Sequence, residues 1–173
     1  MVIFDKFHEF SLDQDLSGAG IAGFFISDNT IDVRNSRVRD FGRGNLAMVR
    51  FTVTTAFTSG GAAVLSAALL LSSDAPANPL PPISNLVTLC ATPLYTLDEL
   101  DVVGAEFYLV IPPVPHLNVT AASGQQAEYR RQYLSVLYSV QTAQFTAGKL
   151  SARTCSDMGG ARPPRHTIGY AGP

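Results

Sequence analysis

Residues 47–72 read AMVRFTVTTAFTSGGAAVLSAALLLS, and apolar and polar side chains alternate along much of this stretch. The odd-numbered positions from Ala47 to Val53 are apolar, and most of the positions between them are polar. Alternation of this kind is typical of a β-strand with one buried face. A similar alternation runs from Leu65 to Leu71. Both halves of the stretch are therefore predicted to be strands.

Two consecutive glycines separate these strands, and glycine allows the positive φ angles that a tight connection needs. We predict that residues 46–57 and 64–72 pair as an antiparallel hairpin with its turn at residues 59–61. Because Ala and Leu are good helix formers, a helix over residues 62–71 is the alternative. The residues predicted to lie in the core of the hairpin are Val49, Phe51, Val53, Leu65 and Leu69.

The same layout returns near the C-terminus, where residues 133–140 alternate in the same way. The motif Phe-Thr-Ala-Gly at 145–148 then repeats the Phe-Thr-Ser-Gly of residues 57–60. We predict a second hairpin here and interpret the two motifs as similar corners of one architecture. Shorter strands are predicted at residues 30–33, 85–90 and 107–111, and a short helix within 121–131.

Seven or eight short strands with polar turns between them favour an all-β fold. We predict an antiparallel β-sandwich of the jelly-roll type with extended N- and C-terminal arms. The expected organisation is an N-terminal arm and glycine-rich lead-in over residues 1–29, a jelly-roll domain over 30–157 and an extended tail over 158–173.

The composition excludes several classes of protein. The chain has 173 residues with a formal net charge of −2, so it can bury a core without disulfides or metals. Nucleic acid and anionic membranes are not expected as partners, because both attract basic surfaces. The longest apolar stretch, residues 62–71, is well short of the ~20 residues that span a bilayer.

Charge is unevenly distributed along the chain. Asp74 is the only formally charged residue between Arg50 and Asp98. Such a window belongs to a core, to strands that are polar without charge, or to a surface that a partner covers. The sequence leaves the last two interpretations open.

Patterns typical of catalysis are missing from the sequence. The histidines His8, His116 and His166 form no closely spaced pair, and no nucleophile elbow, phosphate loop or dinucleotide fingerprint occurs. We predict a non-enzymatic protein with no catalytic residue, no cofactor and no metal site. Cys90 and Cys155 are interpreted as small apolar residues, although a disulfide between them stays open.

One acidic cluster needs an interpretation of its own. Asp98, Glu99 and Asp101 surround Leu97 and Leu100. Acidic residues are favoured in a solvated turn or in the first turn of a helix, and we prefer that interpretation to a cation site.

Four segments, taken in order, carry a resemblance to a known family. They are Ile3-Phe4-Asp5-Lys6 with Ser11-Leu12-Asp13-Gln14; Asp40-Phe41-Gly42-Arg43-Gly44; residues 56–63 with Leu71-Ser72-Ser73-Asp74; and residues 133–138 with 145–149. In these segments the sequence resembles the small jelly-roll cement (head decoration) proteins of tailed bacteriophage capsids.

The resemblance implies a structural protein that binds the outer surface of an icosahedral capsid and stabilises it by bridging major capsid subunits. It implies the major capsid protein as a partner and self-association into a homo-oligomer, a dimer rather than a trimer. It places the protein on the capsid exterior of the virion after synthesis in the host cytoplasm. The alternative is a β-sandwich receptor- or sugar-binding module of a virion fibre or spike.

The tail is the segment expected to reach a neighbouring subunit. Paired glycines and paired prolines within residues 158–173 disfavour a helix or a central strand. We expect Arg162 and Arg165 to meet acidic groups of the capsid, and Ile168 and Tyr170 to act as apolar anchors.

Overall fold

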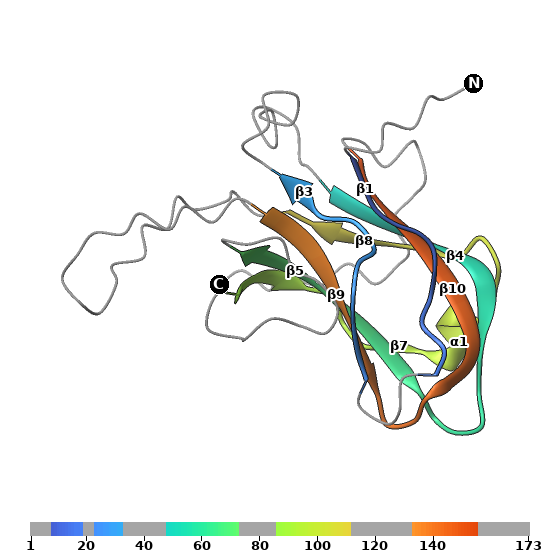
Figure 1. Cartoon of the computed structure of the whole chain (residues 1–173). Coiled ribbons are helices and arrows are strands. Elements are labelled where there is room, and N and C mark those ends of the chain that lie inside the picture. The colour runs from blue at the N-terminus through green and yellow to red at the C-terminus, as the bar shows by residue number, and fades with distance from the viewer. Residues whose placement is uncertain (1–7, 19–22, 33–47, 73–85, 112–132, 156–173) are drawn as a thin grey trace, which may run out of the picture.

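The computed structural model describes residues 8–18, 23–32, 48–72, 86–111 and 133–155. These residues form ten strands and one short helix (Figure 1). In chain order they are β1 (Glu9–Asp15), β2 (Phe24–Ile26), β3 (Ile31–Asp32), β4 (Met48–Ser59), β5 (Val64–Ser72), β6 (Leu86–Ala91), β7 (Tyr95–Thr96), α1 (Leu97–Leu100), β8 (Glu106–Val110), β9 (Tyr133–Gln141) and β10 (Phe145–Cys155).

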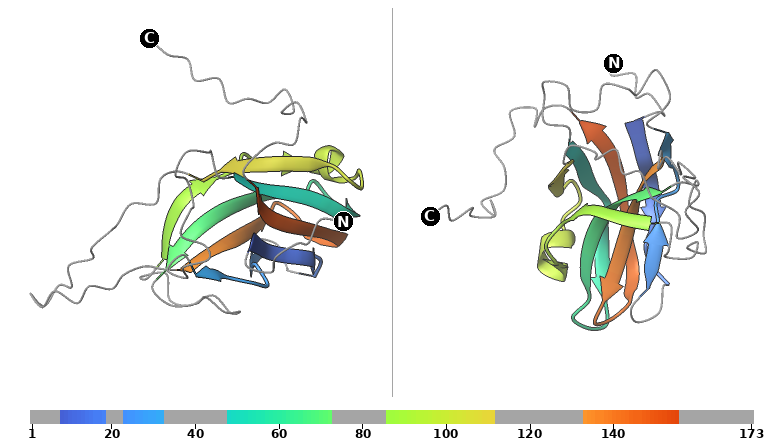
Figure 2. Two further views of the ribbon diagram at one scale, coloured as in Figure 1. Left: turned by 90° about the horizontal axis from the view of Figure 1, so that it is seen from above. Right: turned by 90° about the vertical axis from the view of Figure 1, so that its left-hand side faces the viewer.

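The strands form two antiparallel sheets packed as a sandwich, which confirms the predicted fold class (Figure 2). The four-stranded sheet has the order β1-β10-β4-β8. The six-stranded sheet has the order β2-β9-β5-β6, with β3 beside β9 and β7 beside β5. The jelly-roll topology stays a prediction, which this order supports because β1 and β2, β4 and β5, and β9 and β10 each lie in opposite sheets.

Both predicted hairpins are wrong in their pairing. The strands exist, but β4 pairs with β10 and β8, whereas β5 pairs with β9, β6 and β7. The connections β4–β5 and β9–β10 therefore cross from one sheet to the other. Alternation predicts which side chains face the core, but both sheets face the same core and each offers partners for hydrogen bonds. The helix alternative over residues 62–71 is also wrong, because β5 covers most of it.

The two Phe-Thr-x-Gly motifs lie side by side where the chain changes sheets. Ser59 at the end of β4 is paired with Phe145 at the start of β10. The rings of Phe57 and Phe145 meet edge to face with 4.7 Å between their centroids. The hydroxyls of Thr58 and Thr146 share a hydrogen bond of 2.8 Å. The repeated motif thus builds one joint between the two crossings.

Gly148 allows this joint to close. Its φ of +147° is a conformation that residues with a side chain rarely adopt. A Cβ atom at this position would overlap the ring of Phe57. The aromatic ring therefore packs directly against the backbone of β10.

The core predicted from the alternation is confirmed. Val49, Phe51, Val53, Leu65 and Leu69 are each at most 1% exposed. Phe51 stacks on Phe107 of β8 with 4.6 Å between ring centroids, and it meets Tyr138 of β9 edge to face at 6.3 Å. This cluster joins the two sheets at the centre of the sandwich.

The predicted N-terminal boundary is wrong, because the sandwich begins well before residue 30. β1 and β2 lie within residues 1–29 and form edge strands of the two sheets. Phe10 and Leu16 are fully buried. The side-chain amide of Gln14 donates a 2.6 Å hydrogen bond to the carbonyl of Ile26, which ties the two edges together.

The shorter predicted strands are present with small shifts. The strands expected at 30–33, 85–90 and 107–111 are β3, β6 and β8. The short helix expected within 121–131 and the tail of 158–173 lie outside the described residues.

We predict that Gly148→Ala destabilises the protein by roughly 3 kcal/mol, because the new methyl group displaces Phe57 and strains the backbone. Chemical denaturation of the purified variant measures this change. Gly60→Ala is the matched control, since no atom lies within 4 Å of the position that its Cβ would take. Equal stabilities of the two variants would contradict the described joint.

Candidate functional site

The outer faces of the two sheets differ in charge. Among the described residues, the six-stranded sheet carries one charged residue, Asp32 on β3. The four-stranded sheet carries charged residues on every strand. The charge-poor window noted between Arg50 and Asp98 therefore includes β5 and β6 of the six-stranded sheet.

Small, uncharged side chains form part of the outer face of the six-stranded sheet. Ser66 and Ala68 of β5 point outward, because their neighbours Leu65, Ala67 and Leu69 belong to the core. They are paired across the sheet with Ser139 and Leu137 of β9. All four are partly exposed. We call these four residues, Ser66, Ala68, Leu137 and Ser139, the uncharged face.

The uncharged face has a limited extent. Beside it on β2, Phe24 is paired with Ser139 and is 57% exposed. Toward the other end of β5, Leu70 and its partner Ser135 also point outward, yet they are 2% and 0% exposed. Along β5 and β9, the accessible outer surface therefore lies at the Ser66 end.

A row of charges crosses the outer face of the four-stranded sheet. Glu9 of β1 is paired with Arg153 of β10, which in turn lies opposite Arg50 of β4. Arg153 forms a 3.1 Å ion pair with Glu9, and Arg50 lies 3.8 Å from Glu106 of β8. The glutamates offset the repulsion between two arginines on adjacent strands.

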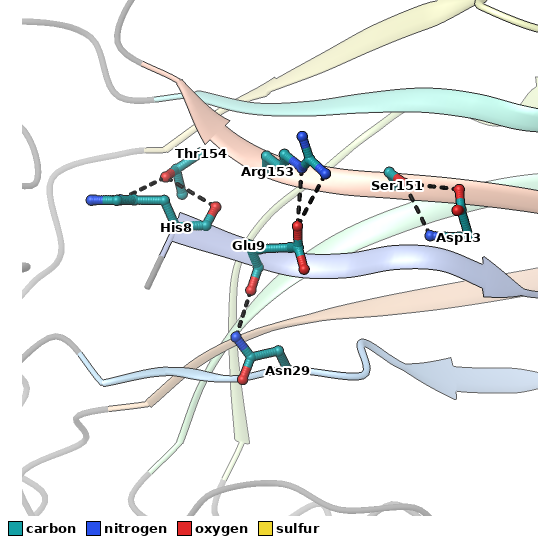
Figure 3. A network of polar contacts seen from close by, with 7 residues as sticks. All are labelled: His8, Glu9, Asp13, Asn29, Ser151, Arg153 and Thr154. Carbon is teal, nitrogen blue, oxygen red and sulfur yellow. Dashed lines mark hydrogen bonds and ion pairs between the residues drawn. The ribbon is translucent and has the colours of Figure 1, made fainter. Parts of the chain in front are cut away.

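Further hydrogen bonds hold this row in place (Figure 3). The amide of Asn29 donates to the carbonyl of Glu9, and His8 lies 3.0 Å from the hydroxyl of Thr154. The hydroxyl of Ser151 accepts a hydrogen bond from the backbone N–H of Asp13. The edge strand β1 is thereby fixed against β10 by side chains as well as by its backbone.

A hollow of about 320 Å³ lies on the same face. Its lining residues are Leu12, Asp13, Arg50, Thr52, Thr54, Glu106, Ser151 and Arg153. The hydroxyl oxygen of Thr54 is buried and has no hydrogen-bond partner among the described residues. Guanidinium donors, hydroxyls and carboxylates together suit a polar ligand that both donates and accepts hydrogen bonds.

The phenol of Tyr108 extends this polar surface along β8. It donates a 2.6 Å hydrogen bond to Glu106. Burial, and then this hydrogen bond, raise the pKa of Tyr108 to about 12. The phenol is therefore protonated at neutral pH and acts as a donor that orients Glu106 beside Arg50.

No group of three or more His, Cys, Asp or Glu side chains is placed to hold a metal ion in the part of the chain that the structure describes. Within those residues there is also no helix long and apolar enough to cross a membrane. His116, His166 and the four tail residues Arg162, Arg165, Ile168 and Tyr170 lie outside the described residues.

Cys90 and Cys155 form no disulfide in the structure. Both are partly buried. The thiol of Cys90 donates a hydrogen bond to the carbonyl of Val110 at 3.3 Å, and burial raises the pKa of Cys90 to about 11. A thiol with this pKa is protonated at neutral pH and is a poor nucleophile.

The acidic cluster predicted to form a turn or a helix start lies at α1 (Figure 1). Asp98 and Glu99 are in its first turn, and Asp101 follows its last residue. The carboxylate of Glu99 accepts hydrogen bonds from the backbone N–H and the hydroxyl of Thr96, at 2.8 and 3.0 Å. These bonds stabilise the first turn of the helix. Val102 and Val103, which follow α1, are exposed, and no sequence pattern indicated this exposure.

Comparison with protein-family models finds no match, and none of the curated proteins matches the sequence.

We predict that Cys90 reacts slowly with iodoacetamide in the folded protein, because only a small fraction of the thiol is ionised below pH 10. The measurement uses Cys155→Ser, so that Cys90 is the only thiol. The alkylation rate is expected to rise about tenfold between pH 9 and pH 10, and unfolding in urea should remove the delay. A rise of about twofold or less over this pH range, as for a thiol with the ordinary pKa near 9, would contradict the assigned environment.

Proposed function

We propose that this protein is a capsid cement protein of a tailed bacteriophage. It binds the outside of an icosahedral head, bridges major capsid subunits and associates with copies of itself. Its role is mechanical rather than enzymatic, and its place is the capsid exterior of the virion. The proposal starts from the order of the four sequence segments that resemble this family.

The uncharged face is the observation that supports this proposal most. Protein interfaces are poor in charged residues at their centres, because an unpaired charge is costly to remove from water. Ser66, Ala68, Leu137 and Ser139 meet this condition on two adjacent strands. The small side chains of Ser66, Ala68 and Ser139 also let a partner backbone approach closely. We assign the capsid-binding surface to this face.

The outer face of the four-stranded sheet is suited to contact with water. Its glutamates and arginines are matched within the protein, through Glu9 with Arg153 and Arg50 with Glu106. These pairs balance the charges of the sheet within the protein, and a charged surface of this kind stays soluble without a partner. We therefore assign the four-stranded sheet to the side that faces away from the shell.

We predict that Ser66→Lys with Ser139→Lys weakens binding to heads at least roughly tenfold, because two lysines would be desolvated without partners. Cosedimentation with heads purified without the protein measures this binding. The thermal midpoint of the free variant should change little, since both side chains point outward. Leu12→Lys, at a 55% exposed position on the other sheet, is the control and should bind normally.

The outcome that contradicts the assignment is normal binding by the double variant together with weak binding by Leu12→Lys.

Copy number gives a separate test of the proposed role. A cement protein should be present in hundreds of copies in each purified particle, whereas a fibre component should be present in tens.

A receptor- or sugar-binding module is the second candidate, and the hollow on the four-stranded sheet favours it. Arg50, Asp13 and Thr52 offer the mixed donors and acceptors that recognise sugar hydroxyls. The two proposals use different faces of the molecule. For a sugar-binding module, Arg50→Ala should abolish binding to host-cell glycans, and Ser66→Lys should leave it unchanged.

A further inference from the structure

Three exposed apolar side chains belong to the short segment around α1. Leu94, Val102 and Val103 are 53%, 58% and 63% exposed. They make up half of the six large apolar side chains that are exposed among the described residues. We call residues 94–103 the α1 shoulder. Three exposed apolar side chains within ten residues of sequence make this segment a candidate surface for a partner.

The α1 shoulder is also acidic. Asp98 and Asp101 are exposed, and their carboxylates form no hydrogen bond or ion pair with the described residues. Glu99 differs, because its carboxylate stabilises the first turn of the helix through Thr96. The shoulder contains no basic residue. Two of its three negative charges are therefore available to a partner.

The chain contains a segment with complementary chemistry. Residues 158–173 carry Arg162 and Arg165, the apolar residues Ile168 and Tyr170, and no acidic residue. Two arginines match the two free carboxylates, and the two apolar residues match the exposed leucine and valines.

The segment is long enough to leave its own domain. Its 16 residues can extend over ~50 Å at the rise of an extended chain. They follow β10, whose last residue, Cys155, is paired with Met48 at the start of β4. The α1 shoulder adjoins β4 farther along, where Gly104 donates a hydrogen bond to the carbonyl of Val53.

We propose that residues 158–173 of one copy dock on the α1 shoulder of a second copy. Arg162 and Arg165 pair with Asp98 and Asp101, while Ile168 and Tyr170 cover the exposed apolar side chains. The inference rests on the proposed self-association but not on the capsid, so it is tested with the isolated protein. From the sequence, these arginines were expected to meet acidic groups of the capsid. In this proposal, a second copy of the protein supplies the acidic groups.

A charge exchange between two variants tests the contact. The first variant carries Asp98→Lys and Asp101→Lys, and the second carries Arg162→Glu and Arg165→Glu. In each variant alone, the tail and the α1 shoulder carry charges of the same sign. Its self-association should therefore be roughly tenfold or more weaker than that of the natural sequence, as measured by sedimentation equilibrium at low salt. In a 1:1 mixture every tail meets a shoulder of opposite charge, and association should return.

Other outcomes would contradict the proposal. If both variants associate like the natural sequence, or the natural sequence is a monomer at tens of micromolar, the proposal is wrong. If the mixture stays monomeric while one chain carrying all four changes associates, the contact lies within one copy and the proposal is again wrong. Asp28→Lys, Leu12→Lys and Gln144→Lys together change the net charge by the same +4 at three exposed sites outside the α1 shoulder. This variant controls for net charge and should associate normally.

The two proposals fail in different ways. Cosedimentation of the same variants with heads reports on the capsid contact, which the charge exchange does not alter at the uncharged face. Restored self-association without any binding to heads would reject the cement function and keep the docking of the tail.

Discussion

The ring of Phe57 on the backbone of Gly148 is the contact on which the rest of the structure depends. It lies where β4 and β10 are paired, next to the points at which the β4–β5 and β9–β10 connections cross to the other sheet. The ring of Phe145 packs edge to face against the same ring. Because the two crossings are held together, the strands on their other side, β5 and β9, lie next to each other. They form the central pair of the six-stranded sheet.

The sequence predicts the strands and the core well, because alternation reports directly on burial. Val49, Phe51 and Leu65 are buried as expected. It predicts the pairing poorly. A glycine turn between two alternating stretches suits a hairpin and a crossing equally, and the choice depends on a contact between residues 57 and 148 that are far apart in the chain. The repeated Phe-Thr-x-Gly motif was the one local sign of this joint.

The proposed functional surfaces were predictable only in part. The lack of charge between Arg50 and Asp98 left open whether a partner covers this part of the chain or its strands are polar without charge, and the register of the six-stranded sheet was needed to define the uncharged face on β5 and β9. The charge row could not be predicted, because Glu9, Arg50 and Arg153 meet only through long-range pairing. The α1 shoulder depends on the exposure of Val102 and Val103, which the sequence does not report.

The central claim is that the uncharged face of the six-stranded sheet binds the shell while the charged sheet faces solvent. Electron cryo-microscopy of decorated heads tests it most directly. We predict Ser66, Ala68 and Ser139 in contact with a capsid subunit, and the hollow beside Arg50 open to solvent. A reconstruction with the four-stranded sheet against the shell, or heads without density for this protein, would contradict the claim.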